Sequence, residues 1–360
     1  MNRPILPTIR KNSGPLLLIA GGAAAGAAFW PEPFGWTIWF AFVPLFHEVS
    51  GRAPAAAFLR GWLFGAAVWA AGIYWLPPPL SAFLGVKPEA ALALFAAICA
   101  WHGLMFAILA VALAFADAAL KRRAGWSEGK ALLLASAPAA ALLESFFPML
   151  FPVYFAGTQH FHLPLIQIAE ITGPAGPAWL IMWFNASLYV VIKAAGGSRR
   201  ELRTAVAAFC AVCALLLANE IYGISRMRQV DADSLTAMEQ GRHLEAYLIQ
   251  GSVPLEAPSG AVNGSALSLY RGLTREAAGR NPSALVIWPE SVYGRTAVFM
   301  APDERGVGPG LENGFRTALA MDIPERPALL LGSKAELPDS GTTREPPVRF
   351  NAAYAVGPDK

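Results

Sequence analysis

Long apolar stretches separated by short polar segments fill the first 222 residues of the chain. A helix needs roughly 20 residues to cross the ~30 Å hydrocarbon layer of a membrane. The second stretch is the weakest candidate, because its apolar part is short before His47 and Glu48 arrive, and an interfacial position for it stays open. The pattern predicts a multi-pass helical membrane bundle with seven spans, near residues 13–30, 36–49, 55–76, 89–118, 131–151, 174–194 and 204–222.

Basic residues between these stretches predict the orientation of the bundle. Cytoplasmic loops of membrane proteins carry an excess of Lys and Arg. With a cytoplasmic N-terminus and seven crossings, the outside loops before the last crossing contain only one basic residue, Lys87. We therefore expect everything after residue 222 to lie outside the cytoplasm. The twelve basic residues on the inside are Arg3, Arg10, Lys11, Arg52, Lys121, Arg122, Arg123, Lys130, Lys193, Arg199, Arg200 and Arg203.

Four polar side chains interrupt the apolar stretches: Glu144, Asn185, Asn219 and Glu220. Such residues are costly inside a membrane and are often functional. Glu144 and Glu220 lie near the ends of their stretches, where they can reach water. The alternative is that Glu144, with the loop 151–170, helps to form an outward-facing cavity. The same loop holds an HxH motif, His160 and His162, but no third ligand lies nearby, so we expect no metal site.

After residue 222 the pattern changes to that of a second domain. Residues 223–242 are polar and are expected to link the membrane domain, 1–222, to a domain over 243–360. Short apolar runs there alternate with amphipathic segments, which is typical of an α/β fold. The expected strands lie at 244–250, 284–288, 328–331 and 349–356, and the expected helices at 262–280 and near 311–321.

Composition supports a membrane protein and excludes several other classes. The hydrophobic fraction is 55% and only 15% of residues are charged, against roughly 25% in soluble chains. The net charge of +3 and the scattered basic residues argue against nucleic-acid binding. Cys99, Cys210 and Cys213 all lie in apolar stretches, so we expect neither a disulfide framework nor a zinc site. No cofactor is predicted.

Glu290 is the candidate catalytic residue by position. It follows directly on the apolar strand 284–288 and Pro289. Catalytic groups of open α/β sheets gather at the carboxyl ends of strands. A carboxylate there, crowded by Trp288 and Tyr293, is a candidate general base. The alternative is a loop carboxylate that only accepts backbone hydrogen bonds.

Several motifs carry a resemblance to a known superfamily. The string LVIWPES, Leu285 to Ser291, follows a strand ending in Gln250–Gly251 and resembles the carbon–nitrogen hydrolase (nitrilase) superfamily. The catalytic Glu of that superfamily occupies the position of Glu290. The membrane half is similar to one branch, the apolipoprotein N-acyltransferases. The segments that match this family in order are 29–46, 58–76 and 164–185, followed by ALLLGS at 328–333 and RFNAAYAVGPD at 349–359.

The resemblance implies both a fold and a reaction. The second domain would be an α-β-β-α sandwich on the periplasmic side of a bacterial inner membrane. The family moves an acyl chain from a phospholipid through a Cys thioester to the amino group of a lipoprotein. Membrane lipids, a phospholipid donor and a lipoprotein acceptor are the implied partners. A Glu takes the thiol proton and a Lys stabilises the oxyanion.

This sequence departs from the family after the strand 349–356. The family's Lys and Cys lie further on, whereas no cysteine follows Cys213 here. Of the family's catalytic residues, only Glu290 is therefore assigned in this sequence. We expect these residues to be the first part of a longer enzyme whose C-terminal part is missing here. The sequence also resembles TraB, a membrane protein of conjugal plasmid transfer. A non-catalytic component of a conjugation apparatus is thus the alternative function, and a transporter is disfavoured because no pair of broken helices or charge relay is evident.

Overall fold

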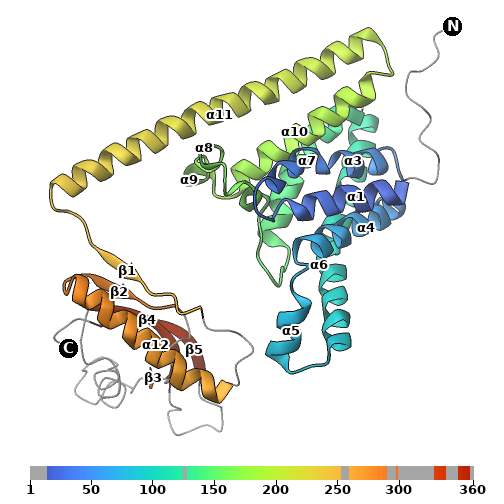
Figure 1. Cartoon of the computed structure of the whole chain (residues 1–360). Helices are drawn as coiled ribbons and strands as arrows, with labels where there is room; N and C mark the ends of the chain where they lie inside the picture. Colours follow the sequence, from blue (N-terminus) through green and yellow to red (C-terminus); the bar gives the residue numbers. More distant parts are fainter. Residues whose placement is uncertain are drawn as a thin grey trace, which may run out of the picture. The chain divides into compact units, whose positions relative to one another are not determined.

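The computed structural model describes residues 14–124, 128–252, 259–289, 297–298, 328–337 and 348–356 of the 360-residue chain. Contacts divide the chain into a helical unit, Met1–Ser234, and a unit that holds a β-sheet, Leu235–Lys360. Figure 1 shows the helices of the first unit in blue to yellow and the strands of the second in orange to red. The division falls within the polar segment 223–242.

Helices form the whole of the first unit where it is described. In this part of the chain, α4, α6, α7, α10 and α11 are long and apolar enough to cross a membrane. The helices are α1 (Gly14–Ala27), η1 (Phe34–Thr37), α2 (Ile38–Ala41), α3 (Val43–Val49), α4 (Pro54–Gly72), α5 (Pro77–Leu84), α6 (Pro88–Ala124), α7 (Glu128–Phe146), η2 (Phe155–Gln159), α8 (Leu163–Ile166), α9 (Ala169–Thr172), α10 (Ala175–Ala194) and α11 (Arg199–Glu239).

Of the first predicted span, 13–30, the structure describes residues 14–30, and helix α1 covers 14 of them. These 14 residues correspond to about 21 Å of helix. The structure therefore confirms a helical region with long apolar helices, while the count of seven crossings and the orientation stay predictions.

Small residues let the first helices pack closely. A Cβ added at Gly22 or Gly26 of α1 would meet the backbone oxygen of Phe64 or Val68 in α4. Gly61 of α4 allows the same close approach to α6. Helices in a membrane gain stability from such contacts, because lipid removes most of the hydrophobic drive between them. These glycines thus hold α1, α4 and α6 together.

The second predicted span, 36–49, is not one helix, which corrects the sequence prediction. It forms the single turns η1 and α2 and the seven-residue helix α3. The broken segment is nevertheless in the core, since Ile38, Phe42 and Leu45 are fully buried. A broken helix is tolerated at this depth only where other groups bind its free backbone atoms.

Two buried side chains bind those free backbone atoms. The Asn185 side-chain oxygen accepts a hydrogen bond from the Phe42 N–H at 3.1 Å, and its amide nitrogen donates to the Ile38 carbonyl at 2.9 Å. The Gln159 amide donates to the Gly35 carbonyl at 2.9 Å. Asn185 is therefore a structural partner of the broken segment, which explains its presence inside an apolar helix.

Helix α11 continues 17 residues beyond the predicted span 204–222, through Glu239. It begins with a capping box, in which Ser198 and Glu201 each bind the backbone N–H of the other, at 2.8 and 3.2 Å. It ends at Gly241, whose φ of 69° suits the left-handed position after a helix. Its buried residues form one stripe, Ala205, Val212, Asn219 and Gly223.

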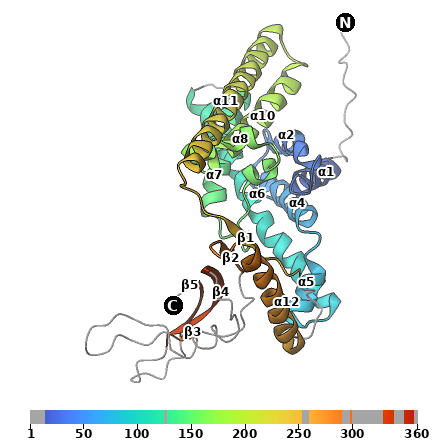
Figure 2. The ribbon, with the colours of Figure 1, turned by 60° about the vertical axis from the view of Figure 1, so that its left-hand side comes forward.

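The second unit contains a five-stranded sheet and one described helix, α12 (Ser259–Arg280). Strand β2 lies between β1 and the first half of β4, β3 pairs with the second half of β4, and all these pairs are parallel. β5 runs antiparallel along β4. Figure 2 shows α12 beside β1 and β2. The strands are β1 (Ala246–Leu248), β2 (Leu285–Ile287), β3 (Ala297–Val298), β4 (Ala328–Leu337) and β5 (Val348–Val356).

The α/β pattern predicted for the second unit is confirmed in outline. The helix expected at 262–280 and the strands expected at 244–250, 284–288, 328–331 and 349–356 are present, although β1 is shorter and β4 longer than predicted. The helix expected near 311–321 lies outside the described residues. One sheet with one helix does not establish the four layers of a nitrilase-like sandwich, which stays a prediction.

Candidate functional site

An apolar pocket of about 230 Å³ lies in the helical unit beside the loop 147–154. Its walls come from the end of α1, from α4 and α6, and from that loop. Pockets with such a lining select apolar ligands and use a few polar groups to orient them. An aliphatic chain fits this description. Its lining includes Phe29, Val68, Trp69, Met105, Phe106 and Phe155.

Two aromatic side chains of α6 hold the loop that forms one wall of this pocket. His102, which is fully buried, accepts a hydrogen bond from the Leu150 N–H at its Nε2 atom, at 3.1 Å. Its Nδ1 atom lies 2.8 Å from the Ile98 carbonyl, so the proton sits on Nδ1 and the ring is neutral. The neighbouring Trp101 donates its indole N–H to the Pro148 carbonyl at 3.0 Å.

Glu144 of α7 holds the other end of the loop. Its carboxylate accepts a hydrogen bond from the Phe155 N–H at 2.6 Å, at the first residue of η2. A carboxylate at a helix N-terminus is favourable, because the free N–H groups there carry partial positive charge. Glu144 is only 4% exposed, so the interpretation that it reaches water is wrong. It contacts the loop, as the cavity alternative expected, and whether the pocket faces outward stays a prediction.

Trp69 gives the pocket a polar group. Its indole nitrogen is buried and has no hydrogen-bond partner among the described residues. Its ring lies over His102, with 4.0 Å between the ring centroids. A buried donor without a partner is unfavourable, and this one belongs to a side chain that lines the pocket. It can donate to an oxygen of a bound ligand, such as the carbonyl of an ester.

The predicted catalytic residue, Glu290, lies outside the described residues. The strand before it is in place: β2 is central, and Trp288 is buried with its N–H donated to the Leu330 carbonyl at 2.9 Å. The Trp288 indole donates to the Thr274 hydroxyl of α12, also at 2.9 Å. The role of Glu290 as general base therefore stays a prediction.

The remaining polar residues singled out in the sequence lie around α8 and α11. Glu220 is a quarter exposed and pairs with His162, whose Nε2 atom lies 3.2 Å from its carboxylate. His160 contacts the Gly157 carbonyl in its own loop. Asn219 donates to the Leu165 carbonyl at 2.9 Å. Within the described residues, no group of three His, Cys, Asp or Glu side chains is arranged to hold a metal ion.

Sequence reasoning missed the roles of His102, Trp69 and Trp101. Each lies in an apolar helix, where an aromatic side chain gives no signal of a polar contact. The partners of Trp101 and His102, which are Pro148 and Leu150, contribute backbone atoms, which have no signature in a sequence. The proximity of Glu144 to a loop was the only available signal.

Comparison with known proteins finds a family model that is similar to part of the helical unit. Residues 21–187 match the family model of the apolipoprotein N-acyltransferase N-terminal domain. This range includes the pocket, the loop that lines it, and Glu144.

Individual relatives extend the similarity into the second unit. The chain is 26% identical to the apolipoprotein N-acyltransferase of Geobacter metallireducens, over 77% of this chain and 50% of the relative. It is 26% identical to that of Rhizobium leguminosarum bv. trifolii, over 95% and 61%, and 28% identical to that of Pseudomonas putida, over 77% and 52%. The chain thus spans about half the length of most curated relatives it matches. On these matches, the chain is similar to the apolipoprotein N-acyltransferases.

Proposed function

We propose that the chain is part of an N-acyltransferase that moves an acyl chain from a membrane phospholipid to the amino group of a lipoprotein. The observation that carries this proposal is the apolar pocket, whose lining residues all fall in the family-matched range. Its apolar lining suits an aliphatic chain. The unpartnered indole N–H of Trp69 provides a donor for the ester carbonyl of that chain.

The proposed chemistry follows the resemblance. A cysteine thiolate attacks the ester carbonyl and the lysophospholipid leaves; the lipoprotein amine then attacks the thioester and releases the thiol. Glu290 is the proposed base: it takes the proton of the thiol and gives it to the leaving lysophospholipid oxygen, and then takes a proton of the amine and gives it to the leaving thiolate. A pocket in the helical unit holds the chain within reach of the membrane from which it comes, and excludes the water that would hydrolyse a thioester. The Cys and the Lys of the family have no counterpart among these residues.

The proposed location is a bacterial inner membrane, with the N-terminus in the cytoplasm and the second unit in the periplasm. Long apolar helices and the family support a membrane location. The distribution of basic residues supports the orientation. The conjugal-transfer alternative stays a prediction, and the relatives named above are all apolipoprotein N-acyltransferases.

The test is acyl transfer from a labelled phospholipid to a synthetic lipopeptide by the complete gene product. Val153 lines the pocket, so Val153→Trp fills part of it and is expected to lower transfer of long acyl chains about tenfold or more. Leu150→Trp is the control, because Leu150 lies in the same loop, is 62% exposed and does not line the pocket. Equal activity of the two variants would contradict the assignment of the pocket.

A further inference from the structure

A second hollow, of about 720 Å³, lies between α9 and α10 on one side and α11 on the other. It shares no lining residue with the pocket beside the loop 147–154. Most of its lining is apolar, and two indole rings, Trp179 and Trp183, contribute to one wall. We call it the lateral groove. Leu180 completes the α10 wall, and Leu215 and Ala218 lie on α11.

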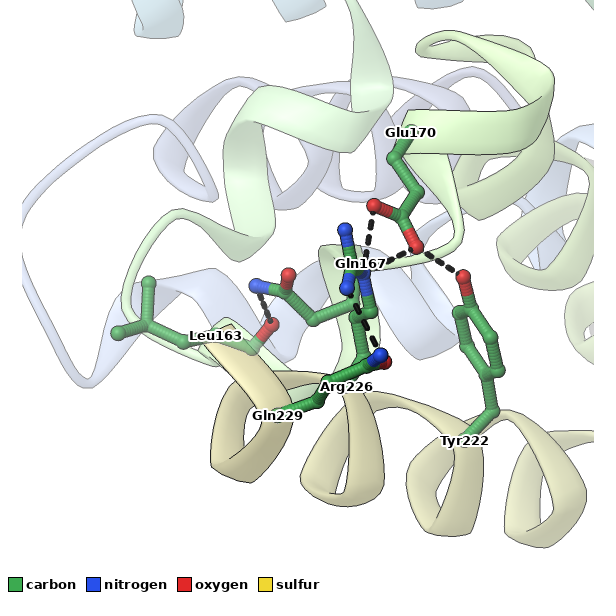
Figure 3. Close-up of polar contacts among 6 residues, drawn as sticks. All are labelled: Leu163, Gln167, Glu170, Tyr222, Arg226 and Gln229. Atoms are coloured by element: carbon green, nitrogen blue, oxygen red, sulfur yellow. Dashed lines mark hydrogen bonds and ion pairs between the residues drawn. The ribbon is translucent and has the colours of Figure 1, made fainter. Parts of the chain in front are cut away.

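One end of the lateral groove is polar. Tyr222 of α11 lines the groove, and Arg226 lies one turn further along the same helix. The Glu170 carboxylate of α9 accepts hydrogen bonds from the Tyr222 hydroxyl and from Arg226 Nε, which is 2.8 Å from both carboxylate oxygens. Figure 3 shows these three side chains converging from the two helices. We call them the mouth cluster.

The mouth cluster is charged. The hydrogen bond from Tyr222, followed by that from Arg226, holds the pKa of Glu170 below its usual value. A carboxylate and a guanidinium therefore lie side by side where the groove ends. From Leu215 to Arg226, α11 rises about 16 Å. Over this length the side chains along the groove change from apolar to charged. That gradient matches an amphiphile with one aliphatic chain in the groove and its polar end at the cluster.

Asn219 supplies an independent observation. It lines the groove and is only 6% exposed. Its side-chain nitrogen donates to the Leu165 carbonyl, but its side-chain oxygen has no partner within the described part of the chain. A buried acceptor without a donor is costly. A ligand that carries an N–H or O–H group near its polar end would remove that cost.

We propose that the lateral groove binds one acyl chain of a membrane phospholipid, whose head group lies at the mouth cluster. The charges are complementary, because the phosphate of a zwitterionic head group is attracted to Arg226 and its ammonium group to Glu170. This site is separate from the pocket proposed for acyl transfer, and its occupancy does not depend on that reaction.

The test uses the full chain in phosphatidylethanolamine vesicles that contain a phospholipid with a photoactivatable diazirine in its acyl chain. After irradiation, labelled peptides are mapped by mass spectrometry. We expect adducts concentrated at residues 175–183 and 215–222. Ala218→Trp and Ala175→Trp fill the groove from its two walls and are expected to lower the yield at these sites at least fivefold.

Leu217→Trp is the matched control, because Leu217 neighbours Ala218, is 61% exposed and does not line the groove. It should leave the labelling unchanged, and all variants should elute as the wild type on size exclusion. Labelling spread evenly over the exposed face of α11 would overturn the proposal. So would labelling that Ala218→Trp leaves intact, or a protein segment found cross-linked in the groove in place of lipid.

Discussion

At the scale of single residues, buried polar side chains of the helical unit bind backbone atoms of distant segments. Asn185 of α10 binds the break between α2 and α3, and Glu144 of α7 binds the first N–H of η2. From the sequence, both were candidates for function because polar groups are rare in apolar helices. Their contacts show that such a residue can instead replace a missing backbone hydrogen bond.

Replacing Asn185 by Leu is expected to destabilise the helical unit. The change roughly keeps the volume but removes the side-chain partner of the Phe42 N–H and of the Ile38 carbonyl. Each unpaired buried group costs about 1–3 kcal/mol. Thermal unfolding in detergent measures the effect. Ser187→Ala is the control, because the buried Ser187 hydroxyl contacts only the Phe184 carbonyl of its own helix, and equal unfolding temperatures for the two variants would refute the role of Asn185.

Two variants of Glu144 test whether the Phe155 N–H requires a hydrogen-bond acceptor or a negative charge. Glu144→Gln retains an oxygen that accepts from the Phe155 N–H, whereas Glu144→Leu leaves that N–H unpaired. We expect hydrogen exchange at residues 150–157 to stay slow in the Gln variant and to speed up about tenfold or more in the Leu variant. Equally fast exchange in both variants would show that the charge, and not the acceptor, holds the loop.

At the scale of secondary structure, helix α11 depends on signals at its two ends and on one small residue. Ser198 and Glu201 cap its start, and Gly241 ends it. Gly223 lies against the backbone of Pro164 in α8. The predicted span ended at residue 222 because the residues after it are polar. Hydropathy indicates burial but not backbone conformation, so the continuation of the helix was not predicted.

Gly223→Leu is expected to separate α11 from α8. A Cβ at this position would meet the Pro164 carbonyl oxygen, so the larger side chain forces the two segments apart. Cysteines at positions 165 and 219, which are neighbours because the Asn219 side chain binds the Leu165 carbonyl in the wild type, should then form a disulfide much more slowly. Ser225→Leu, on the exposed face of α11, should leave the rate unchanged; if it slows the rate as much, the close contact at Gly223 is not the cause.

Elements with a strong local pattern were predicted from the sequence, whereas those set by distant contacts were not. Strand β2 and helix α12 follow from a run of apolar residues and from helical periodicity. The break in the segment 36–49 depends on Asn185 and Gln159, which lie more than 120 residues away. The loop contacts of His102 and the mouth cluster join segments in the same way, and no local signal marks them.

At the scale of the whole molecule, we predict that the helical unit lies in the membrane and that the chain after residue 222 lies outside the cytoplasm. The orientation rests on the distribution of basic residues. A reporter that is active only outside the cytoplasm, fused after residue 240, is therefore expected to be active. A fusion that works only with a cytosolic reporter would reverse the predicted orientation and place the second unit inside the cell.

The most direct measurement of the central claim is the rate of acyl transfer from phospholipid to a lipopeptide by the complete gene product and its Glu290→Gln variant. As the proposed base, Glu290 is expected to contribute about a hundredfold or more. Glu276→Gln is the control, because Glu276 lies on α12 and forms an exposed pair with Arg280. We predict that transfer collapses only in the Glu290 variant; equal transfer by both variants, at equal protein levels, would contradict the assignment of Glu290 as the base.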